Sequence, residues 1–182
     1  VSGDLDPHLW LLGLRNGVLD VRTGDVLPSN PEYLITKQMD VAYDPGVVAT
    51  DTLTYMSTMI PNAAMRDYVQ RSLAYTMTGE QDQRAFFVVH GERGTGKSQF
   101  VELWGKMFGT YATVAADAAF RKRERGNTGP SAELHALQGA RFVFASESDE
   151  DVVLDADIVK RVCGGESMST RAITPVPITA SV

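Results

Sequence analysis

The spacing of hydrophobic and polar positions changes several times along the chain, and each spacing predicts a different element. Near the start, the apolar runs Leu11–Arg15 and Val18–Arg22 flank Asn16-Gly17, a residue pair that favours a β-hairpin turn. Thr23–Asp25 predicts a second turn, and residues 33–43 predict a further extended piece. The chain is therefore expected to begin with a small β-rich layer.

A helical spacing replaces this pattern from about Thr50. Asp51 is the expected N-cap of the first helix, and Pro61-Asn62 is expected to end it. A second helix, expected to end near Gly79, is predicted by an apolar face made of Met65, Tyr68, Val69 and Leu73. This part of the sequence contains no catalytic constellation, so we expect it to form a layer packed on a following domain.

Residues 85–109 combine a predicted strand, a glycine-rich turn and a predicted helix. Ala85–Val89 is an apolar, β-rich run that is typical of a buried strand. Gly91–Ser98 fits the pattern G-x-x-x-x-G-K-[ST]. The helix expected next ends at Gly109, and its apolar positions recur at helical spacing: Phe100, Leu103, Trp104 and Met107. This is the setting that a phosphate-binding P-loop requires.

The residue types of this loop suit phosphate binding. Glycines let successive backbone N–H groups face an anion, and the N-terminus of the next helix adds partial positive charge. We expect Lys97 to reach the β- and γ-phosphates of ATP, and the Ser98 hydroxyl to ligate Mg²⁺. The predicted nucleotide-binding residues are Gly91, Glu92, Arg93, Gly94, Thr95, Gly96, Lys97 and Ser98. The alternative is a plain glycine-rich turn between a strand and a helix.

Downstream of the loop, Arg141–Ala145 reads as an apolar strand followed by an acid, Glu147. A strand that ends in an acid after a P-loop is the Walker B pattern, whose acid polarises the attacking water or holds Mg²⁺ through water. Ser146 stands where an Asp is common, so both roles are assigned to Glu147. Residues 149–151 are interpreted as a solvated acidic turn, with help to the metal as the alternative.

Two further elements are predicted between the loop and this strand. Tyr111–Val114 predicts a strand, and Ser131–Gln138 predicts a short helix with Gly139 as its stop. Residues 121–130 are basic and rich in turn formers. We interpret this segment as a solvated loop, with a DNA contact as the alternative.

The tail predicts one helix and one hairpin. Asp155 is expected to cap a helix that carries Lys160 and Arg161 and stops at Gly164-Gly165, and Arg171 is expected in a β-hairpin after it. The alternative is a helix with an exposed basic edge.

The composition of the chain is that of a globular protein with its own hydrophobic core. The chain has 182 residues and 43% hydrophobic content, enough for a core in one or two domains. Cys163 is the single cysteine, so no internal disulfide forms and a reducing cytoplasm is expected. The sequence contains no signal peptide and no apolar run long enough to span a membrane, and its three histidines are scattered, which argues against a metal site. The chain begins with Val, which indicates a fragment.

The net charge of −6 is unevenly distributed. Residues 1–83 carry 5 basic and 11 acidic side chains, whereas residues 84–182 carry 12 of each. If the protein meets nucleic acid, the first part is therefore the less favourable contact face.

The order of these features resembles the helicase half of phage and plasmid primase–helicases, in the AAA+-related helicase superfamily 3. Residues 16–20 and 43–45 are similar to the lead-in domain of that family, and Gly91–Ser98 matches its motif A. Ala145–Glu147 looks like motif B, where a Ser before the Glu is expected. Lys160, Gly164-Gly165-Glu166 and Arg171 look like the motif that forms a DNA-facing hairpin in the central pore.

The resemblance implies an α/β P-loop NTPase domain, AAA+-like, over residues 81–182, preceded by a small α+β lead-in domain over residues 1–80. It implies an ATP- and Mg²⁺-dependent DNA helicase that forms a homo-oligomeric, hexameric ring for replication in the cytoplasm of a bacterial host. Lys97 and Glu147 are the expected catalytic residues, Ser98 and Glu147 the metal residues, and Lys160 and Arg171 the contacts to single-stranded DNA.

One departure and two alternatives stand beside this interpretation. Motif C and the arginine finger of the family are not visible before Val182, so the ATPase domain is expected to be incomplete, and the sequence does not decide whether this fragment hydrolyses ATP by itself. A P-loop kinase acting on a small molecule is one alternative, although no lid with arginines is evident. A nucleotide-binding assembly module that does not hydrolyse ATP is the other.

Overall fold

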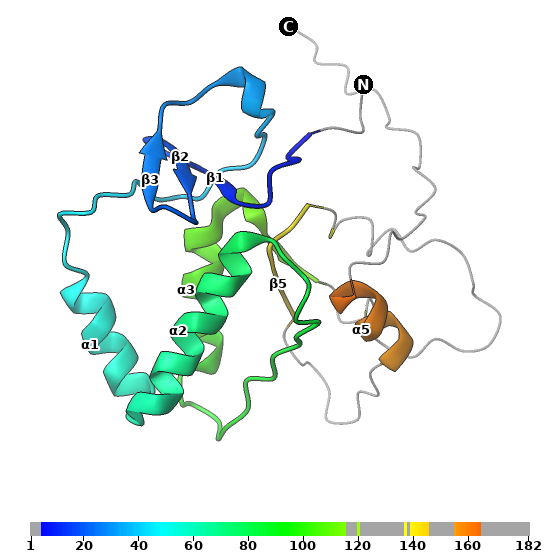
Figure 1. The fold of residues 1–182 in the computed structure, drawn as a ribbon. Coiled ribbons are helices and arrows are strands. Elements are labelled where there is room, and N and C mark those ends of the chain that lie inside the picture. The colour runs from blue at the N-terminus through cyan, green and yellow to red at the C-terminus, as the bar shows by residue number, and fades with distance from the viewer. Residues whose placement is uncertain (1–4, 116–119, 121–136, 138, 146–154, 165–182) are drawn as a thin grey trace, which may run out of the picture.

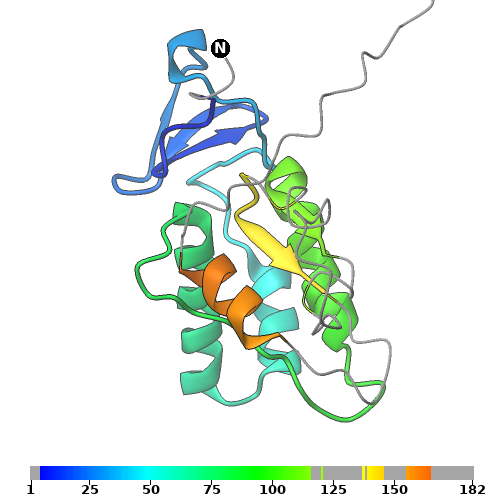
Figure 2. The same ribbon diagram turned by 90° about the vertical axis from the view of Figure 1, so that its right-hand side faces the viewer.

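The computed structural model of the chain describes residues 5–115, 120, 137, 139–145 and 155–164 (Figure 1). Within them, a three-stranded sheet lies at one end of a set of helices, and a two-stranded sheet lies among the helices (Figures 1 and 2). In chain order the elements are β1 (Leu11–Leu14), β2 (Gly17–Asp20), β3 (Asp25–Leu27), η1 (Pro31–Tyr33), α1 (Thr50–Met59), α2 (Ala63–Thr78), α3 (Lys97–Phe108), η2 (Gly109–Tyr111), β4 (Ala112–Val114), β5 (Phe142–Phe144) and α5 (Ala156–Cys163).

The predicted hairpin at the start of the chain is confirmed. β1, β2 and β3 pair antiparallel in that order, and the second turn lies between β2 and β3 as expected. Because Leu14 pairs with Gly17, the two-residue loop is Arg15-Asn16, one position earlier than predicted. Gly17 is instead the first residue of β2, where a Cβ would lie 2.5 Å from the Leu27 carbonyl oxygen. Glycine is required at that position by the close approach of β3.

The extended piece predicted over residues 33–43 forms no strand, but part of it lies between β1 and α3 and forms hydrogen bonds to both. The Met39 N–H donates to the Gly13 carbonyl at 2.8 Å, and the Asp40 N–H donates to the Met107 carbonyl at 3.0 Å. This segment therefore joins β1 to the end of α3 through single hydrogen bonds. Met39 itself is buried in the core.

The two helices after residue 49 form where they were predicted, with two differences. Ala49, which makes no side-chain cap bond, occupies the N-cap of α1, and Asp51 lies in the first turn, so the predicted cap was wrong. The break before α2 is confirmed, because the Asn62 side chain accepts from the Met65 N–H, and α2 ends at Gly79 with φ +71°.

The second difference concerns the predicted apolar face of α2, of which Val69 and Leu73 are half-buried and the other two residues are exposed. Met65 and Tyr68 are each more than half exposed, at 53% and 56%, and α2 contains no fully buried residue. Amphipathic spacing is enough to predict a helix, but burial of its apolar face depends on a neighbouring surface.

The strand predicted at Ala85–Val89 was also wrong, because the structure assigns no strand there. The side chains of this segment are exposed, with Val88 at 73% and Phe86 at 49%. A strand exists only when a neighbour accepts and donates its backbone hydrogen bonds, and no described segment pairs with Ala85–Val89. An apolar, β-rich composition does not supply that neighbour.

The helix and strands after the loop are confirmed at α3, β4 and β5. β4 and β5 pair parallel, with Thr113 opposite Val143. β5 lies between α3 and α5 (Figure 2), since Phe142 stacks on Phe108 of α3 at 5.0 Å while Val143 packs in a second cluster with Ile158 and Val162 of α5. α5 begins as predicted, because the Asp155 carboxylate accepts from the N–H groups of residues 157 and 158.

One hydrophobic core joins residues from both sides of the loop. Leu12, Leu19 and Met39 pack in the same buried cluster as Phe108 and Tyr111. The division into domains at residue 80 remains a prediction, but the described residues on its two sides pack together.

Several predictions lie outside the described residues. They are the basic segment at 121–130, the helix at 131–138 (of which Leu137 is described), the residues of the predicted acidic site, namely Ser146, Glu147 and 149–151, and, in the tail, Glu166 and Arg171 with its hairpin. In the described part of the chain, no helix combines the length and the apolar character that crossing a membrane requires.

Candidate functional site

The loop Gly91–Ser98 curls tightly where α3 begins, with its last two residues in the first turn of that helix, and is the candidate functional site. Gly94 and Gly96 adopt φ values of +79° and +84°, in the left-handed region that favours glycine. The Thr95 hydroxyl donates to the Glu92 carbonyl at 2.9 Å, which closes the turn from within. Gly96 is one of the two glycines that the motif fixes, so there the motif coincides with a backbone conformation that favours glycine, and Gly94 is a further glycine at a variable position of the motif.

Lys97 folds back over this loop. Its ammonium donates to the carbonyls of Gly91 and Glu92, with Nζ to oxygen distances of 2.7 and 2.6 Å. Lys97 makes no ion pair with any described carboxylate. Among the described residues its charge is thus held at the loop by carbonyl dipoles, and an anion with several oxygens is a stronger partner.

The N-terminus of α3 presents positive potential at the same place. Gly96 is the N-cap and provides no side-chain acceptor, and the first turn contains no acidic residue. The first N–H groups of a helix have no partner within the helix, and the helix dipole adds about half a positive charge there. Uncapped N–H groups and the Lys97 ammonium together form a site suited to phosphate oxygens.

A residue from the first helix, α1, packs against the loop. The methyl carbon of Met59, the last residue of α1, lies 2.8 Å from the position that a Cβ on Gly96 would occupy. The positive φ of Gly96 therefore favours glycine at this position, and a Cβ there would also require the end of the flexible Met59 side chain to move. Sequence reasoning missed this contact, because the motif carries no information about a residue 37 positions earlier.

Of the two metal ligands predicted from the sequence, one lies within the described residues and the other does not. Ser98 lies in the first turn of α3 and is exposed, so its hydroxyl is accessible beside the loop. Glu147 lies outside the described residues. No cluster of three or more His, Cys, Asp or Glu side chains suited to a metal ion occurs within the part of the chain that the structure describes.

Lys160, predicted to contact DNA, lies exposed on α5. With Arg84, Phe86 and Cys163 it lines a hollow of about 280 Å³. Burial raises the pKa of the Cys163 thiol, which keeps it protonated at neutral pH and makes a thiolate nucleophile unfavourable here. The structure brings Lys160 close to the segment before the loop, and its predicted partner Arg171 is outside the described residues.

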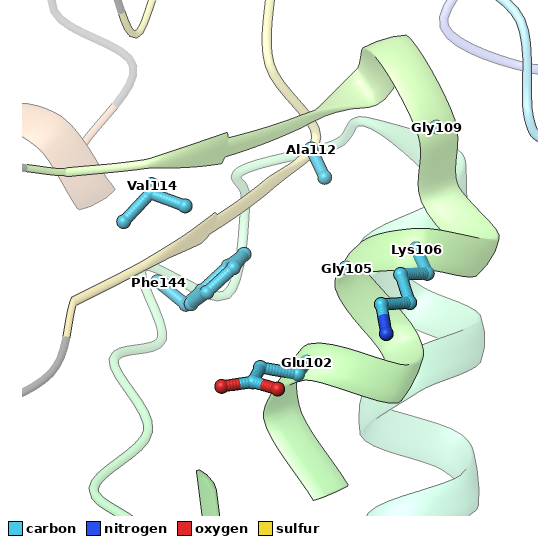
Figure 3. Close-up of a pocket in the computed structure, with 7 residues that line it drawn as sticks. All are labelled: Glu102, Gly105, Lys106, Gly109, Ala112, Val114 and Phe144. Carbon is cyan, nitrogen blue, oxygen red and sulfur yellow. The ribbon is translucent and has the colours of Figure 1, made fainter. Parts of the chain in front are cut away.

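A second hollow of about 330 Å³ lies between α3 and the strands β4 and β5 (Figure 3). Its floor is apolar, with Phe144 pointing toward Gly105, and Glu102 and Lys106 stand at its side on α3 (Figure 3). No residue of Gly91–Ser98 lines it. This hollow is therefore separate from the candidate phosphate site.

Comparison with known proteins gives two findings. A family model described as "D5 N terminal like" matches residues 2–75, a range that ends before the loop. The chain is also 24% identical over 179 residues to "Putative helicase L207/L206" of Acanthamoeba polyphaga mimivirus. This similarity covers 96% of the chain but 19% of the relative, so the chain spans about a fifth of that protein's length. Residues 2–75 thus resemble D5 N-terminal-like domains, and the chain as a whole is related to a viral protein named as a helicase.

Proposed function

We propose that this chain binds Mg²⁺–ATP at Gly91–Ser98 and serves as part of an ATP-driven DNA helicase in replication. The observation that carries the proposal is the position of Lys97, whose ammonium rests on two carbonyls of its own loop at the uncapped N-terminus of α3. The similarity to a protein named as a helicase supports the same function.

The loop residues have distinct roles in this proposal. On binding, Lys97 exchanges the carbonyls of Gly91 and Glu92 for the β- and γ-phosphate oxygens, a charge-assisted contact that is stronger than the one it replaces. Backbone N–H groups of the glycine-rich turn and of the first turn of α3 donate to the remaining oxygens. The Ser98 hydroxyl fits a Mg²⁺ ligand by its exposure and its place beside Lys97. Bound Mg²⁺ would neutralise phosphate charge.

The finer parts of the function rest on the resemblance to superfamily 3 primase–helicases of phages and plasmids. They are an AAA+-like P-loop fold, a hexameric ring, Glu147 as the acid that orients water, and contact of single-stranded DNA with Lys160 and Arg171. Two observations favour the fold: the β4–β5 pair is parallel, and α3 packs on β5 directly after the loop. The exposure of Lys160 is compatible with a nucleic-acid contact.

Nucleotide titration of Lys97→Ala tests the proposal. Loss of a charge-assisted hydrogen-bonding partner costs about 1.5–3 kcal/mol, so affinity for Mg²⁺–ATP should fall about 10- to 150-fold. Lys106→Ala is the matched control, because Lys106 is exposed on the same helix and lines the separate hollow. Calorimetry should show wild-type affinity for the control, and circular dichroism should show both variants folded. Near-normal affinity in Lys97→Ala would contradict the P-loop assignment.

Phosphate release, measured with and without single-stranded DNA on a chain extended past residue 182, separates the helicase from its alternatives. A helicase hydrolyses ATP faster with DNA, a kinase transfers phosphate only to an acceptor, and an assembly module binds ATP without turnover. With the same extended chain, fluorescence anisotropy of labelled single-stranded DNA, measured across a series of salt concentrations, tests the DNA contacts. Replacing Lys160 and Arg171 by Ala should flatten the salt dependence of binding and leave nucleotide affinity unchanged.

A further inference from the structure

Arg141, directly before β5, donates to four backbone carbonyls from separate parts of the chain. Its Nη1 lies 2.9 Å from the Leu9 oxygen and 2.6 Å from the Met77 oxygen. Its Nη2 lies 3.1 Å from the His8 oxygen and 2.8 Å from the Leu11 oxygen. One side chain thus connects β5 with the segment that leads into β1 and with the end of α2.

The charge of Arg141 is balanced by dipoles and an aromatic ring. No carboxylate in the described part of the chain forms an ion pair with it. The guanidinium carbon lies 4.9 Å from the centre of the Tyr111 ring, in the geometry of a cation–π contact. The Met77 carbonyl belongs to the last turn of α2, where the helix dipole is negative. Burial lowers the pKa of the guanidinium, and the nearby Tyr111 and the Asp6 carboxylate oppose that shift.

The surroundings are shaped to admit this side chain. A Cβ on Gly79, the residue that ends α2, would lie 3.2 Å from the Arg141 Nε, and Gly79 also has φ +71°. Any larger residue at this position would press on the guanidinium. Glycine here both ends the helix and leaves room for the four hydrogen bonds.

Two contacts of β5, the strand that follows Arg141, join it to α3, the helix that follows the phosphate loop. Phe142, its neighbour in the chain, stacks on Phe108 of α3 at 5.0 Å. Phe144 lies so close to α3 that its ring is 2.8 Å from the position of a Cβ on Gly105. β5 is therefore packed on α3, and Arg141 joins that pair to the N-terminal sheet.

We propose that Arg141 is a positioning residue that couples the N-terminal sheet to the phosphate loop, by clamping the start of β5 onto the carbonyls of residues 8, 9, 11 and 77. The proposal rests on nucleotide binding at Gly91–Ser98, the function proposed above. Nucleotide that orders the start of α3 thereby stabilises β1 through β5 and Arg141. In reverse, displacement of the N-terminal sheet weakens nucleotide binding, because such coupling is reciprocal.

Arginine is specifically suited to this role. Its planar group carries five N–H donors in a fixed fork, whereas a lysine ammonium carries three donors at a single point. Four carbonyls that approach from different segments match the fork and exceed what one ammonium satisfies. Arg141→Lys should therefore keep the charge and lose most of the coupling.

Amide hydrogen exchange with and without a non-hydrolysable Mg²⁺–ATP analogue tests the proposal. The probes are the amides of Leu12 and Gly13 in β1 and of Phe100 in α3. In the wild type, nucleotide should slow exchange at both places. In Arg141→Met and Arg141→Lys, it should slow exchange in α3 while the effect on β1 is lost. Arg71→Met is the matched control, since Arg71 is exposed on α2 and pairs with the nearby Asp67; it should behave as the wild type.

A purely structural role would speed exchange in the variants without removing the effect of nucleotide on β1. Persistence of that effect in Arg141→Lys would overturn the proposal, and this variant remains informative if Arg141→Met does not fold. If the wild type binds no nucleotide, the proposed function fails. The coupling is then tested by comparing amide exchange in Arg141→Lys and in the wild type without ligand. Arg141→Lys should then speed exchange at least about tenfold in both β1 and α3. Faster exchange in β1 alone would overturn the coupling.

Discussion

Replacement of Tyr111 by Phe removes one hydroxyl from the centre of the shared core. Tyr111 is 1% exposed, and its oxygen accepts the Gly13 N–H at 3.0 Å. The two residues are 98 positions apart, so this bond connects the N-terminal sheet with the segment after α3. Phe keeps the ring, its packing and the cation–π contact with Arg141, and removes only the acceptor.

The expected cost follows from the buried N–H that is left without a partner. An unsatisfied buried donor costs about 1–3 kcal/mol, more than the net gain from an ordinary hydrogen bond. For a chain of this length, each kcal/mol corresponds to about 2–4 °C in the midpoint of thermal unfolding. Tyr111→Phe should therefore lower the midpoint by several degrees.

Denaturant unfolding, followed by circular dichroism, measures this free energy. Tyr68→Phe is the control, because Tyr68 is 56% exposed and its hydroxyl makes no hydrogen bond to other described residues. The control should stay within about 0.5 kcal/mol of the wild type, as surface substitutions usually do. A Tyr111→Phe variant as stable as the control would refute the reasoning, because the buried bond would then contribute nothing.

Alkaline pH gives a second signature of the same residue. Burial raises the pKa of the Tyr111 phenol above its usual value of 10.0. The unfolded chain ionises at a lower pH than the folded one, so stability is fully present below pH 10 and is lost as pH rises above it. The Tyr111→Phe variant should lose less stability than the wild type over this range.

Two further predictions concern the backbone and acidic pH. Gly24 has φ +80° with open space around it, so Gly24→Ala should lower the free energy of unfolding by about 1–2 kcal/mol through backbone strain alone. Gly109→Ala should lower it by more than about 3 kcal/mol, because the new Cβ would lie 2.4 Å from the Gln38 oxygen. Equal free energies of unfolding for the two variants would contradict the crowding argument. The Arg22 side chain lowers the pKa of Asp20 to about 2, so stability from this pair is full above pH 3.8 and is lost as pH falls toward 2. An acid titration of Asp20→Asn should lack that component, and an unchanged profile would show that the pair is not formed.

Much of the local structure could be predicted from the sequence. The N-terminal hairpin, α3 with its end at Gly109 and the Asp155 cap of α5 all depend on interactions between residues close in the chain. Turn residues, capping side chains and apolar periodicity report such interactions directly. The motif in Gly91–Ser98 likewise predicted a curled backbone, and Gly94 and Gly96 there have positive φ values.

Other features depend on partners distant in the chain, and local patterns do not identify those partners. Ala85–Val89 has the composition of a strand but has no paired neighbour among the described residues, and the apolar residues Met65 and Tyr68 of α2 remain exposed. Residues 38–40 bridge β1 and α3 although nothing in their sequence marks a bridge. A strand or a buried face is a property of two surfaces together, and the sequence of one surface describes only half of it.

The clearest example is Arg141. In the sequence it is a single basic residue before an apolar strand, and no motif distinguishes it from a solvent-exposed side chain. Tertiary structure alone brings the carbonyls of residues 8, 9, 11 and 77 to one guanidinium and places Tyr111 beside it. Backbone carbonyls are common to every residue type, so their convergence leaves no trace in the sequence. The sequence by itself thus determined the phosphate-loop motif and most local elements, whereas only tertiary packing decided how that loop is joined to the N-terminal sheet.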